Sequence, residues 1–449
     1  MKVLLISANV TTNPYPVYPI GIEYVAGALA PRHEVHLLDM NVPDGPDPIR
    51  RAVGEFAPDL VGLSLRNIDN VDTVNPQSYI DGYRDLVERL RACTPAPLVL
   101  GGSGFSIFPG ELMALLKADF GVVGAGETLE RLIEALETGA DPSAVPGVAV
   151  PGGEIPEPVV WTKTRARRIQ PPPALLEFYL KRGGMLNLQT QRGCPYRCLY
   201  CTYPHLDGCR PCPDDPETAG ETARHLQDLG AGYLFITDSV FNADWEHSLS
   251  VARAFRRHGV TVPWGAFFAP TRPPGGYYEA LREAGLSHVE FGTESLSDAM
   301  LHAYRKPFSV AEAVAAHEAV RRAGLHIAHY FLLGGPGEDG RTLDETLGNA
   351  ETLERAVFFF FCGVRIFPFT PLHERALAEG QLAPGQNLLT PVFYRSPGIA
   401  APDIMARIHR QAGGRNNWVY GDGGRESERI VSRLHAYGHP GPLWELLLR

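Results

Sequence analysis

The chain has 449 residues, of which 44% are hydrophobic and 20% are charged, and its formal net charge at neutral pH is −10. This length allows two or three domains, and an acidic chain without a basic stripe argues against a nucleic-acid partner. No apolar run reaches the roughly 18 residues that predict a membrane span. The seven cysteines lack an even framework and predict a reducing, cytoplasmic location.

Residues 1–139 alternate short β-branched runs with amphipathic stretches, which predicts a doubly wound, Rossmann-like α/β domain with a parallel sheet. The expected strands are Lys2–Ser7, Glu34–Leu38, Leu60–Leu63, Leu98–Leu100 and Phe120–Val123. The expected helices are Ile20–Ala30, Pro48–Phe56, Ser78–Arg91, Pro109–Leu116 and Glu127–Leu136. Sheets of this type bind ligands at the carboxyl ends of their strands.

Small and polar residues follow three of these strand ends. Ser64, Leu65 and Arg66 come after the third strand, and glycine clusters begin at Gly101 and Gly124 after the next two. Neither the glycine clusters nor the first turn carries Gly-x-Gly-x-x-Gly, so a nicotinamide cofactor is not expected. Glycine permits tight turns, and it also lets backbone approach a large, flat ligand closely; both interpretations stay open.

The remainder of the chain predicts a linker, a second α/β domain and a tail. Residues 140–184 are rich in proline, which predicts a linker between two domains. Residues 185–371 predict six βα units, a partial barrel rather than the eight units of a full one. Its expected strands are Met185–Gln191, Tyr233–Thr237, Val262–Phe268, His288–Gly292, Ile327–Leu333 and Val357–Phe367. Residues 372–449 predict a helical tail that caps the barrel.

Three cysteines, Cys194, Cys198 and Cys201, lie just after the first barrel strand, with three and two intervening residues. Thiolates suit iron–sulfur clusters and zinc. A 4Fe-4S cluster normally takes four cysteines, so three would leave one iron open to another ligand. A zinc or auxiliary-cluster site is an open alternative, because a second group of ligand residues follows closely. That group consists of His205, Cys209 and Cys212.

This cysteine spacing, with an aromatic residue before the last cysteine, resembles the radical S-adenosylmethionine (radical SAM) superfamily, and the likeness extends to about residue 371. The resemblance implies that the three cysteines hold a 4Fe-4S cluster. It also implies that the open iron chelates S-adenosylmethionine, which one electron from an external flavodoxin- or ferredoxin-type donor cleaves to a 5′-deoxyadenosyl radical. The S-adenosylmethionine contacts that it implies are Tyr200, Asp238, Ser239, Glu294, Lys306 and Gly334.

Each of these contacts has an implied partner atom. Asp238 and Ser239 stand where the superfamily has a Gly-Gly-Glu that binds the methionine amino group, and here the glycines are missing. Glu294 would accept hydrogen bonds from the ribose hydroxyls, and Lys306 or the neighbouring Arg305 would pair with the methionine carboxylate. The turn that begins at Gly334 resembles the family's turn beside the adenine.

Residues 1–139 resemble the cobalamin-binding domain of one subgroup, some of whose members are associated with lipid biosynthesis. The implied cobalamin contacts are Ser64, Leu65, Arg66, Gly101, Gly102, Ser103, Gly124, Gly126 and Glu127. One departure is that the Asp-x-His-x-x-Gly motif is missing, since residues 9–19 contain no histidine. We therefore expect cobalt without a histidine ligand on its lower face, and Arg66 is a candidate to face that side.

These resemblances predict an enzyme that methylates an unactivated carbon of a small-molecule or lipid-like substrate. One alternative keeps the same cofactors but ends in cyclisation or rearrangement. Another is a cluster- and cobalamin-binding sensor without turnover.

Overall fold

The computed structural model describes the chain except residues 13–14, 43–44, 161–170, 422–423 and 449 and the side chains of 424–428. The chain forms two compact units. The amino-terminal unit comprises Met1–Asn70, Gln77–Tyr179 and His205–Gly208, and the barrel unit comprises Val71–Pro76, Leu180–Pro204 and Cys209–Arg449. In the described part of the chain, no helix is both long enough and apolar enough to cross a bilayer.

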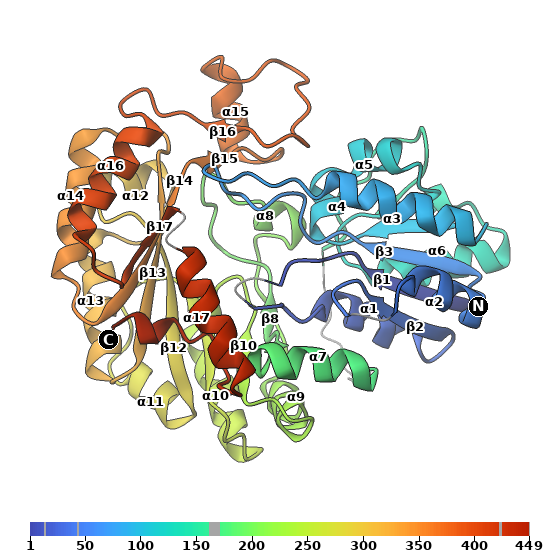
Figure 1. Ribbon diagram of the computed structural model, residues 1–449, viewed down its shortest axis with the longest axis horizontal. Coiled ribbons are helices and arrows are strands. Elements are labelled where there is room, and N and C mark those ends of the chain that lie inside the picture. The colour runs from blue at the N-terminus through green and yellow to red at the C-terminus, as the bar shows by residue number, and fades with distance from the viewer. Residues whose placement is uncertain (13–14, 43–44, 161–170, 422–423, 449) are drawn as a thin grey trace. The chain divides into compact units, whose positions relative to one another are not determined.

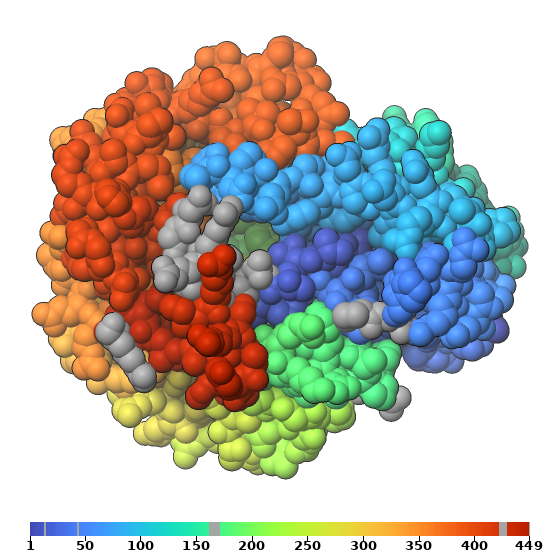
Figure 2. Space-filling view, viewed as in Figure 1, coloured from blue at the N-terminus to red at the C-terminus, as the bar shows by residue number. Residues whose placement is uncertain are grey.

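The amino-terminal unit is built on a sheet with the strand order β2-β1-β3-β4-β5-β6, in which only β6 is antiparallel to its neighbour. Its strands are β1 (Lys2–Ser7), β2 (Glu34–Asp39), β3 (Leu60–Ser64), β4 (Leu98–Gly101), β5 (Phe120–Val122) and β6 (Val148–Ala149). Its helices are α1 (Ile20–Leu29), α2 (Pro48–Phe56), α3 (Ile80–Cys93), α4 (Ser103–Ile107), α5 (Pro109–Leu116), α6 (Thr128–Thr138) and the short η1 (Pro142–Ala144). Figure 2 shows the side chains of α2 and α3 next to each other on the visible face of this unit.

The sequence explains why β1 is central. Five of its six residues are buried, as expected for a parallel strand covered on both faces. Val3 and Leu5 pack in one cluster with Leu60, Val99 and Leu132, so one face of the sheet is sealed by helix α6. This packing leaves the carboxyl strand ends as the polar edge of the unit.

The barrel unit contains a parallel sheet with the order β17-β14-β13-β12-β11-β10-β7. These strands are β7 (Met185–Leu188), β10 (Tyr233–Ile236), β11 (Trp264–Phe268), β12 (Leu286–Glu294), β13 (His326–Leu333), β14 (Ala356–Cys362) and β17 (Trp418–Tyr420). Helices α7 (Pro173–Gly183) and α8 (Tyr203–Leu206) each contain residues of both units. The other helices of the barrel unit are α9 (Pro216–Asp228), η2 (Phe241–Ala243), α10 (Trp245–Arg257), α11 (Tyr277–Glu283), α12 (Asp298–Ala303), α13 (Val310–Arg322), α14 (Gly340–Thr352), α15 (Pro371–Ala378), α16 (Ala401–Ala412), α17 (Gly424–Ala436) and η4 (Trp444–Leu448). Two small antiparallel sheets complete it, β8 (Gln191–Arg192) with β9 (Cys212–Pro213) and β15 (Val364–Arg365) with β16 (Phe393–Tyr394). Figure 1 shows α13 and α14 on the outer side of this curved sheet.

The two faces of the barrel sheet carry different residues. On β11, Trp264 packs edge-to-face on Phe255 of α10, and Phe268 packs on Tyr278 of α11, so both face the helix layer. Phe267 lies between them in sequence and therefore faces the barrel interior.

The carboxyl-terminal segment closes the interior at the end where the strands begin. Trp444 of η4 packs against Ala328 and Val357, and its Nε1 donates to Glu290 Oε1 at 3.0 Å.

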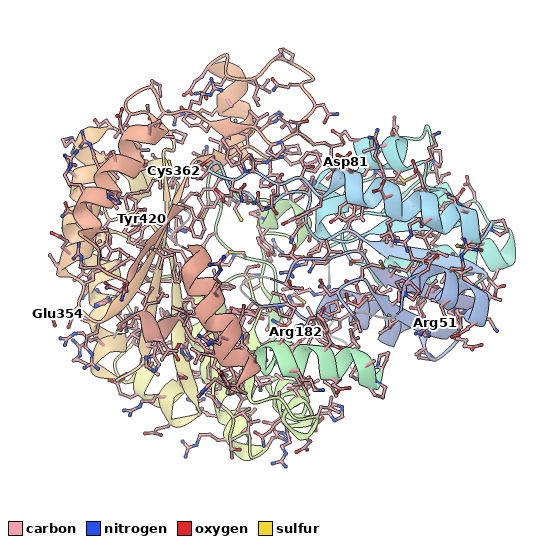
Figure 3. The ribbon with its side chains drawn as sticks, in the orientation of Figure 1. Arg51, Asp81, Arg182, Glu354, Cys362 and Tyr420 are labelled. Atoms are coloured by element: carbon pink, nitrogen blue, oxygen red, sulfur yellow. The ribbon has the colours of Figure 1, made fainter. Side chains whose placement is uncertain are left out.

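The predicted α/β architecture is confirmed, with additions. The tail contributes β17, which pairs in parallel with β14, so it is not only helical. The expected linker contains β6 and helix α7, and its residues 161–170 lie outside the described part. Figure 3 labels Cys362 and Tyr420, the last residues of β14 and β17. Residues 71–76 pack with the barrel unit, where Thr73 Oγ1 donates to the Cys362 carbonyl at 2.5 Å.

Candidate functional site

The three clustered cysteines lie in a loop that is held by the end of helix α12 and the first turn of helix α15. Leu199 N–H, inside the loop, donates to the Tyr304 carbonyl at 3.0 Å, and the Leu199 carbonyl accepts from Leu372 N–H at 2.9 Å. Cys194 is 7% exposed, while Cys198 and Cys201 are partly buried. All seven cysteines of the chain are free thiols. The loop therefore presents three reduced sulfur ligands at the carboxyl end of the barrel strands.

Burial raises the pKa of all three thiols, and it raises that of Cys201 to about 12. The positive charge of the Lys306 ammonium opposes this increase at Cys198 but does not reverse it. Metal binding to such thiols must release their protons. Each cysteine sulfur binds a different iron of a 4Fe-4S cluster, so the three cysteine sulfurs need not converge on one point. The donor set thus fits a three-cysteine cluster.

Tyr200, Glu294 and Lys306, three of the expected S-adenosylmethionine contacts, meet beside this loop. The Tyr200 hydroxyl donates to Glu294 Oε1 at 2.6 Å, and Lys306 Nζ lies 2.7 Å from Glu294 Oε2. The Lys306 and Glu294 side chains are only 9% and 14% exposed. Burial by itself would lower the pKa of Lys306, but the charges of Glu294 and Cys198 outweigh it and raise this pKa. The site thus holds a charged cation next to an anion.

The backbone around Glu294 is unusual. The pairing of β12 with β13 shifts by one residue between Gly292 and Glu294, and Glu294 has a φ of 55°. A non-glycine residue rarely adopts this left-handed conformation, which stores strain at functional sites. The shift turns the Glu294 carboxylate over the barrel interior, because its Oε1 lies 3.4 Å from the position that a Cβ on Gly292 would take.

The turn after β13 is fixed by two buried side chains that are not among the predicted S-adenosylmethionine contacts, Tyr304 and Glu338. The Tyr304 hydroxyl donates to the Leu332 carbonyl at 2.7 Å, and its ring leaves no room for a side chain on Gly335. Gly334 N–H donates to Glu338 Oε2 at 2.7 Å, and burial raises the pKa of Glu338 to about 7. The Gly334 amide is therefore engaged within the protein.

Asp238 differs most from its expected role. It is fully buried, and its carboxylate accepts from Thr190 N–H at 2.7 Å, Thr190 Oγ1 at 2.5 Å and Gln191 N–H at 3.2 Å. Burial raises its pKa to about 7. This carboxylate holds the turn that leads into the cysteine loop, so it positions the site and does not point at a ligand. Ser239 follows it and is only partly buried.

Packing within the protein itself requires glycine at two positions of the amino-terminal unit. Gly102 has a φ of 96°, and a Cβ there would lie 2.7 Å from the Leu65 carbonyl oxygen. Gly124 has a φ of 88°, and a Cβ there would lie 2.4 Å from the Val159 oxygen. The close approach that these two glycines permit is to the protein's own backbone. Around Gly101, by contrast, the nearest atom to a Cβ is at 3.9 Å.

The polar residues at the same strand ends remain accessible. Ser64 ends β3 and is partly exposed, Arg66 and Ser103 are exposed, and the Ser103 hydroxyl donates to the Arg66 carbonyl at 3.0 Å. Arg66 has no ion pair within the described residues. Leu65 is fully buried, and the nearby Gly126 and Glu127 are partly buried. An edge with hydroxyls and one unpaired guanidinium fits a large polar cofactor.

The zinc alternative finds no support in the geometry. Among the described residues, which include His205, Cys209 and Cys212, no three histidine, cysteine or acidic side chains converge on a point that could hold one metal ion.

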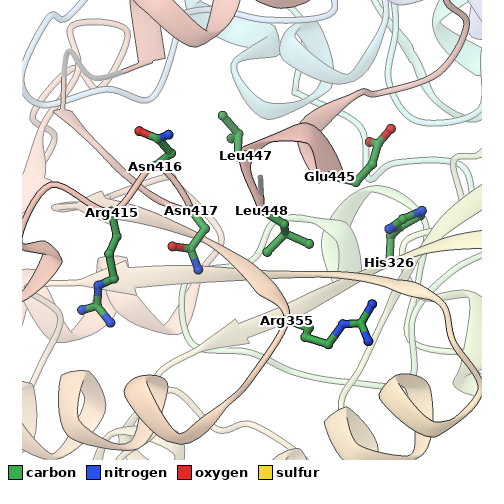
Figure 4. A pocket seen from close by; sticks show the side chains of 8 residues that line it. All are labelled: His326, Arg355, Arg415, Asn416, Asn417, Glu445, Leu447 and Leu448. Atoms are coloured by element: carbon green, nitrogen blue, oxygen red, sulfur yellow. The ribbon is translucent and has the colours of Figure 1, made fainter.

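A separate cavity of about 580 Å³ lies at the opposite end of the barrel strands. Its position is set by His326 at the start of β13, Arg355 before β14 and Asn417 before β17 (Figure 4). The other lining residues are Arg415, Asn416, Glu445, Leu447 and Leu448. It contains no predicted site residue.

Comparisons with known proteins agree with this arrangement. The family model of the B12 binding domain matches residues 6–133, and that of the Radical SAM superfamily matches residues 188–350. The chain is 25% identical to tryptophan 2-C-methyltransferase of Streptomyces laurentii, over 88% of this chain and 77% of that protein. It is 23% identical to cytidylyl-2-hydroxyethylphosphonate methyltransferase of Streptomyces wedmorensis, over 93% of this chain and 91% of that protein.

A solved structure has the same fold. It is the radical S-adenosylmethionine methyltransferase TsrM of Kitasatospora setae, with cobalamin and a 4Fe-4S cluster bound. The TM-score is 0.89 at 23% identity, over 100% of this chain and 97% of that one. The cysteine loop and Glu294 lie within residues 188–350, which the Radical SAM model matches. The ends of β3 and β4 lie within residues 6–133, which the B12 binding model matches. The chain therefore combines an amino-terminal B12 binding domain with a domain of the Radical SAM superfamily.

Proposed function

We propose that this chain is a cobalamin-dependent radical SAM enzyme that transfers a methyl group to a carbon atom of a small molecule. The observation that carries the proposal is the meeting of Tyr200, Glu294 and Lys306 beside three reduced cysteines. When bound, the cluster with S-adenosylmethionine would supply a carbon radical and cobalamin a methyl group, so the hard chemistry belongs to the cofactors.

The residues of the barrel unit have distinct tasks in this proposal. Cys194, Cys198 and Cys201 hold the cluster. Lys306 pairs with the methionine carboxylate, and Glu294 accepts hydrogen bonds from the ribose hydroxyls, as a carboxylate with two free lone-pair directions can. The Tyr200 hydroxyl, 2.6 Å from Glu294, keeps that carboxylate oriented. Because Lys306 and Glu294 neutralise each other in the cofactor-free chain, neither charge is left uncompensated before the cofactor enters.

The strand-end residues of the amino-terminal unit would hold cobalamin. Ser64, Arg66, Gly101 and Ser103 have space or exposure on that edge. Residues 9–19 contain no histidine that could ligate cobalt. Arg66 would contact the bound cofactor, which would supply the methyl group.

An external one-electron donor would dock beside the cysteine loop. Arg197 and Arg210 are exposed and have no ion pair within the described residues, although the whole chain carries a net charge of −10. Two unpaired guanidinium groups next to the cysteines complement an acidic carrier of the flavodoxin or ferredoxin type. The donor is oxidised by one electron in each encounter.

The names of the two curated relatives favour methyl transfer over cyclisation or sensing. Their substrates differ, so they do not fix the substrate of this chain. The test is the product pair formed by the reconstituted enzyme with a converted substrate. Methyl transfer yields S-adenosylhomocysteine together with 5′-deoxyadenosine. A cyclase would give 5′-deoxyadenosine without stoichiometric S-adenosylhomocysteine, and a sensor would cleave no S-adenosylmethionine under strong reductant.

A further inference from the structure

Two phenylalanines on the interior face of the barrel sheet are unusually exposed. Phe267 of β11 is 39% exposed and Phe361 of β14 is 50% exposed. Their helix-facing neighbours Phe268 and Phe360 are 1% and 3% exposed. Exposed aromatic surface is unfavourable in water, and a patch of it beside a candidate active site marks a place for a ligand.

Two further rings extend this surface. Tyr330 of β13 lies nearly parallel to Phe359, with ring centroids 4.9 Å apart and planes 12° apart. Phe361 continues the same stack, 6.3 Å from Tyr330 and 10° from parallel. Phe267 meets Tyr330 edge-on at 6.4 Å. The rings are held by β-strands, so their planes are fixed before any ligand arrives.

Gly292 leaves a recess between these rings. It pairs with Tyr330 across β12 and β13, and it lies on the same interior face as Glu290. A Cβ on Gly292 would approach only Glu294, whose two carboxylate oxygens are 3.4 and 3.8 Å away. The aromatic recess therefore borders the residue that we assign to the ribose hydroxyls.

The bottom of the recess carries no available charge. Glu290 is 3% exposed, and its two oxygens accept from Trp444 Nε1 at 3.0 Å and from the Tyr330 hydroxyl at 2.9 Å. A charged substrate group would find no partner at this depth. The recess is thus suited to a neutral, flat group.

We propose that this recess binds an aromatic ring of the substrate, seated over Gly292 and bordered by Phe267, Tyr330 and Phe361. The proposal rests on the proposed function and names its substrate class. An aromatic ring can stack on the surrounding rings or meet them edge-on, and its flat shape matches the space over Gly292, which has no side chain. An acyl chain would gain only burial and would lose more conformational freedom in a rigid slot.

The test uses the cluster- and cobalamin-loaded enzyme and two neutral probes of similar size, 2-naphthol and its saturated form decahydro-2-naphthol. Anaerobic titration calorimetry should show 2-naphthol binding about tenfold or more tightly than the saturated probe. Phe361→Ala should weaken 2-naphthol binding about tenfold, and Phe361→Leu should weaken it nearly as much, because leucine keeps the apolar character and loses the ring. Tyr437→Ala removes an aromatic residue that is 74% exposed in the tail, and it should leave binding unchanged.

Iron and cobalt counts on every variant show whether the fold is kept. Equal affinity for the two probes, no binding of 2-naphthol, or unchanged binding in Phe361→Leu would each overturn the aromatic assignment. Failure of the proposed function is recognised separately. It would appear as missing iron or cobalt, or as absent product formation, whatever the naphthol affinity.

Discussion

The buried pair of Lys306 and Glu294 gives a quantitative test of the site. At 2.7 Å and an effective dielectric constant of about 20, the two charges attract each other by about 6 kcal/mol before desolvation is subtracted. Because both side chains are largely buried, Lys306→Met leaves the carboxylate without its cation and should destabilise the barrel unit by about 3–5 kcal/mol. The variant that also carries Glu294→Gln removes both charges. Its loss should be smaller than the sum of the two single losses, by about 3 kcal/mol.

The assay is urea unfolding of the cofactor-free protein, followed by tryptophan fluorescence. The signal reports on the barrel unit because it contains four of the five tryptophans: Trp245, Trp264, Trp418 and Trp444. Arg224→Met is the matched control, since Arg224 pairs with Asp228 at 2.8 Å with both side chains about half exposed, and it should cost less than about 1 kcal/mol. The reasoning is wrong if Lys306→Met costs no more than this control, or if the losses at Lys306 and Glu294 simply add.

Three further outcomes follow from the structure. Burial raises the pKa of Asp39 from 3.8 to about 6. Protonated Asp39 therefore stabilises the amino-terminal unit by about 3 kcal/mol below about pH 4, and this stability is lost as the pH rises through 6. Asp39→Asn should flatten this pH dependence, measured by hydrogen exchange of β1 and β2. Gly102→Ala should destabilise the same unit by about 1–3 kcal/mol in chemical unfolding, because φ is 96° there; a neutral substitution would refute the close approach. Charge reversal of both Arg197 and Arg210 should slow stopped-flow reduction by an acidic ferredoxin about tenfold at low salt. It should slow reduction by dithionite, a small anion, much less, and equal slowing with both reductants would contradict the docking assignment.

Much of the fold could be predicted because hydrophobic patterning is local. The strands at Lys2–Ser7 and Ile327–Leu333 were placed within one residue of β1 and β13, since runs of apolar residues bounded by turns specify buried parallel strands. Strand β17 was missed because a segment of three residues, Trp418–Tyr420, carries too short a pattern to be separated from a helical tail. The two-residue β6 was missed for the same reason.

The site shows the same division between local signals and remote contacts. The cysteines, Glu294 and Lys306 could be proposed as site residues because their motif spacings resemble a known family. The true role of Asp238 could not, because it depends on backbone donors 47 and 48 residues away. Nor could the bond between Glu290 and Trp444, which joins residues 154 positions apart.

The account depends on the three clustered cysteines, and counting metals tests it most directly. After anaerobic reconstitution, iron, acid-labile sulfide and cobalt are measured per chain in the parent protein and in the variant with Cys194, Cys198 and Cys201 all changed to alanine. We expect about four irons and four sulfides with about one cobalt in the parent, and loss of iron with retention of cobalt in the variant. A parent chain that holds zinc and no iron, or a variant that still converts S-adenosylmethionine, would contradict the account.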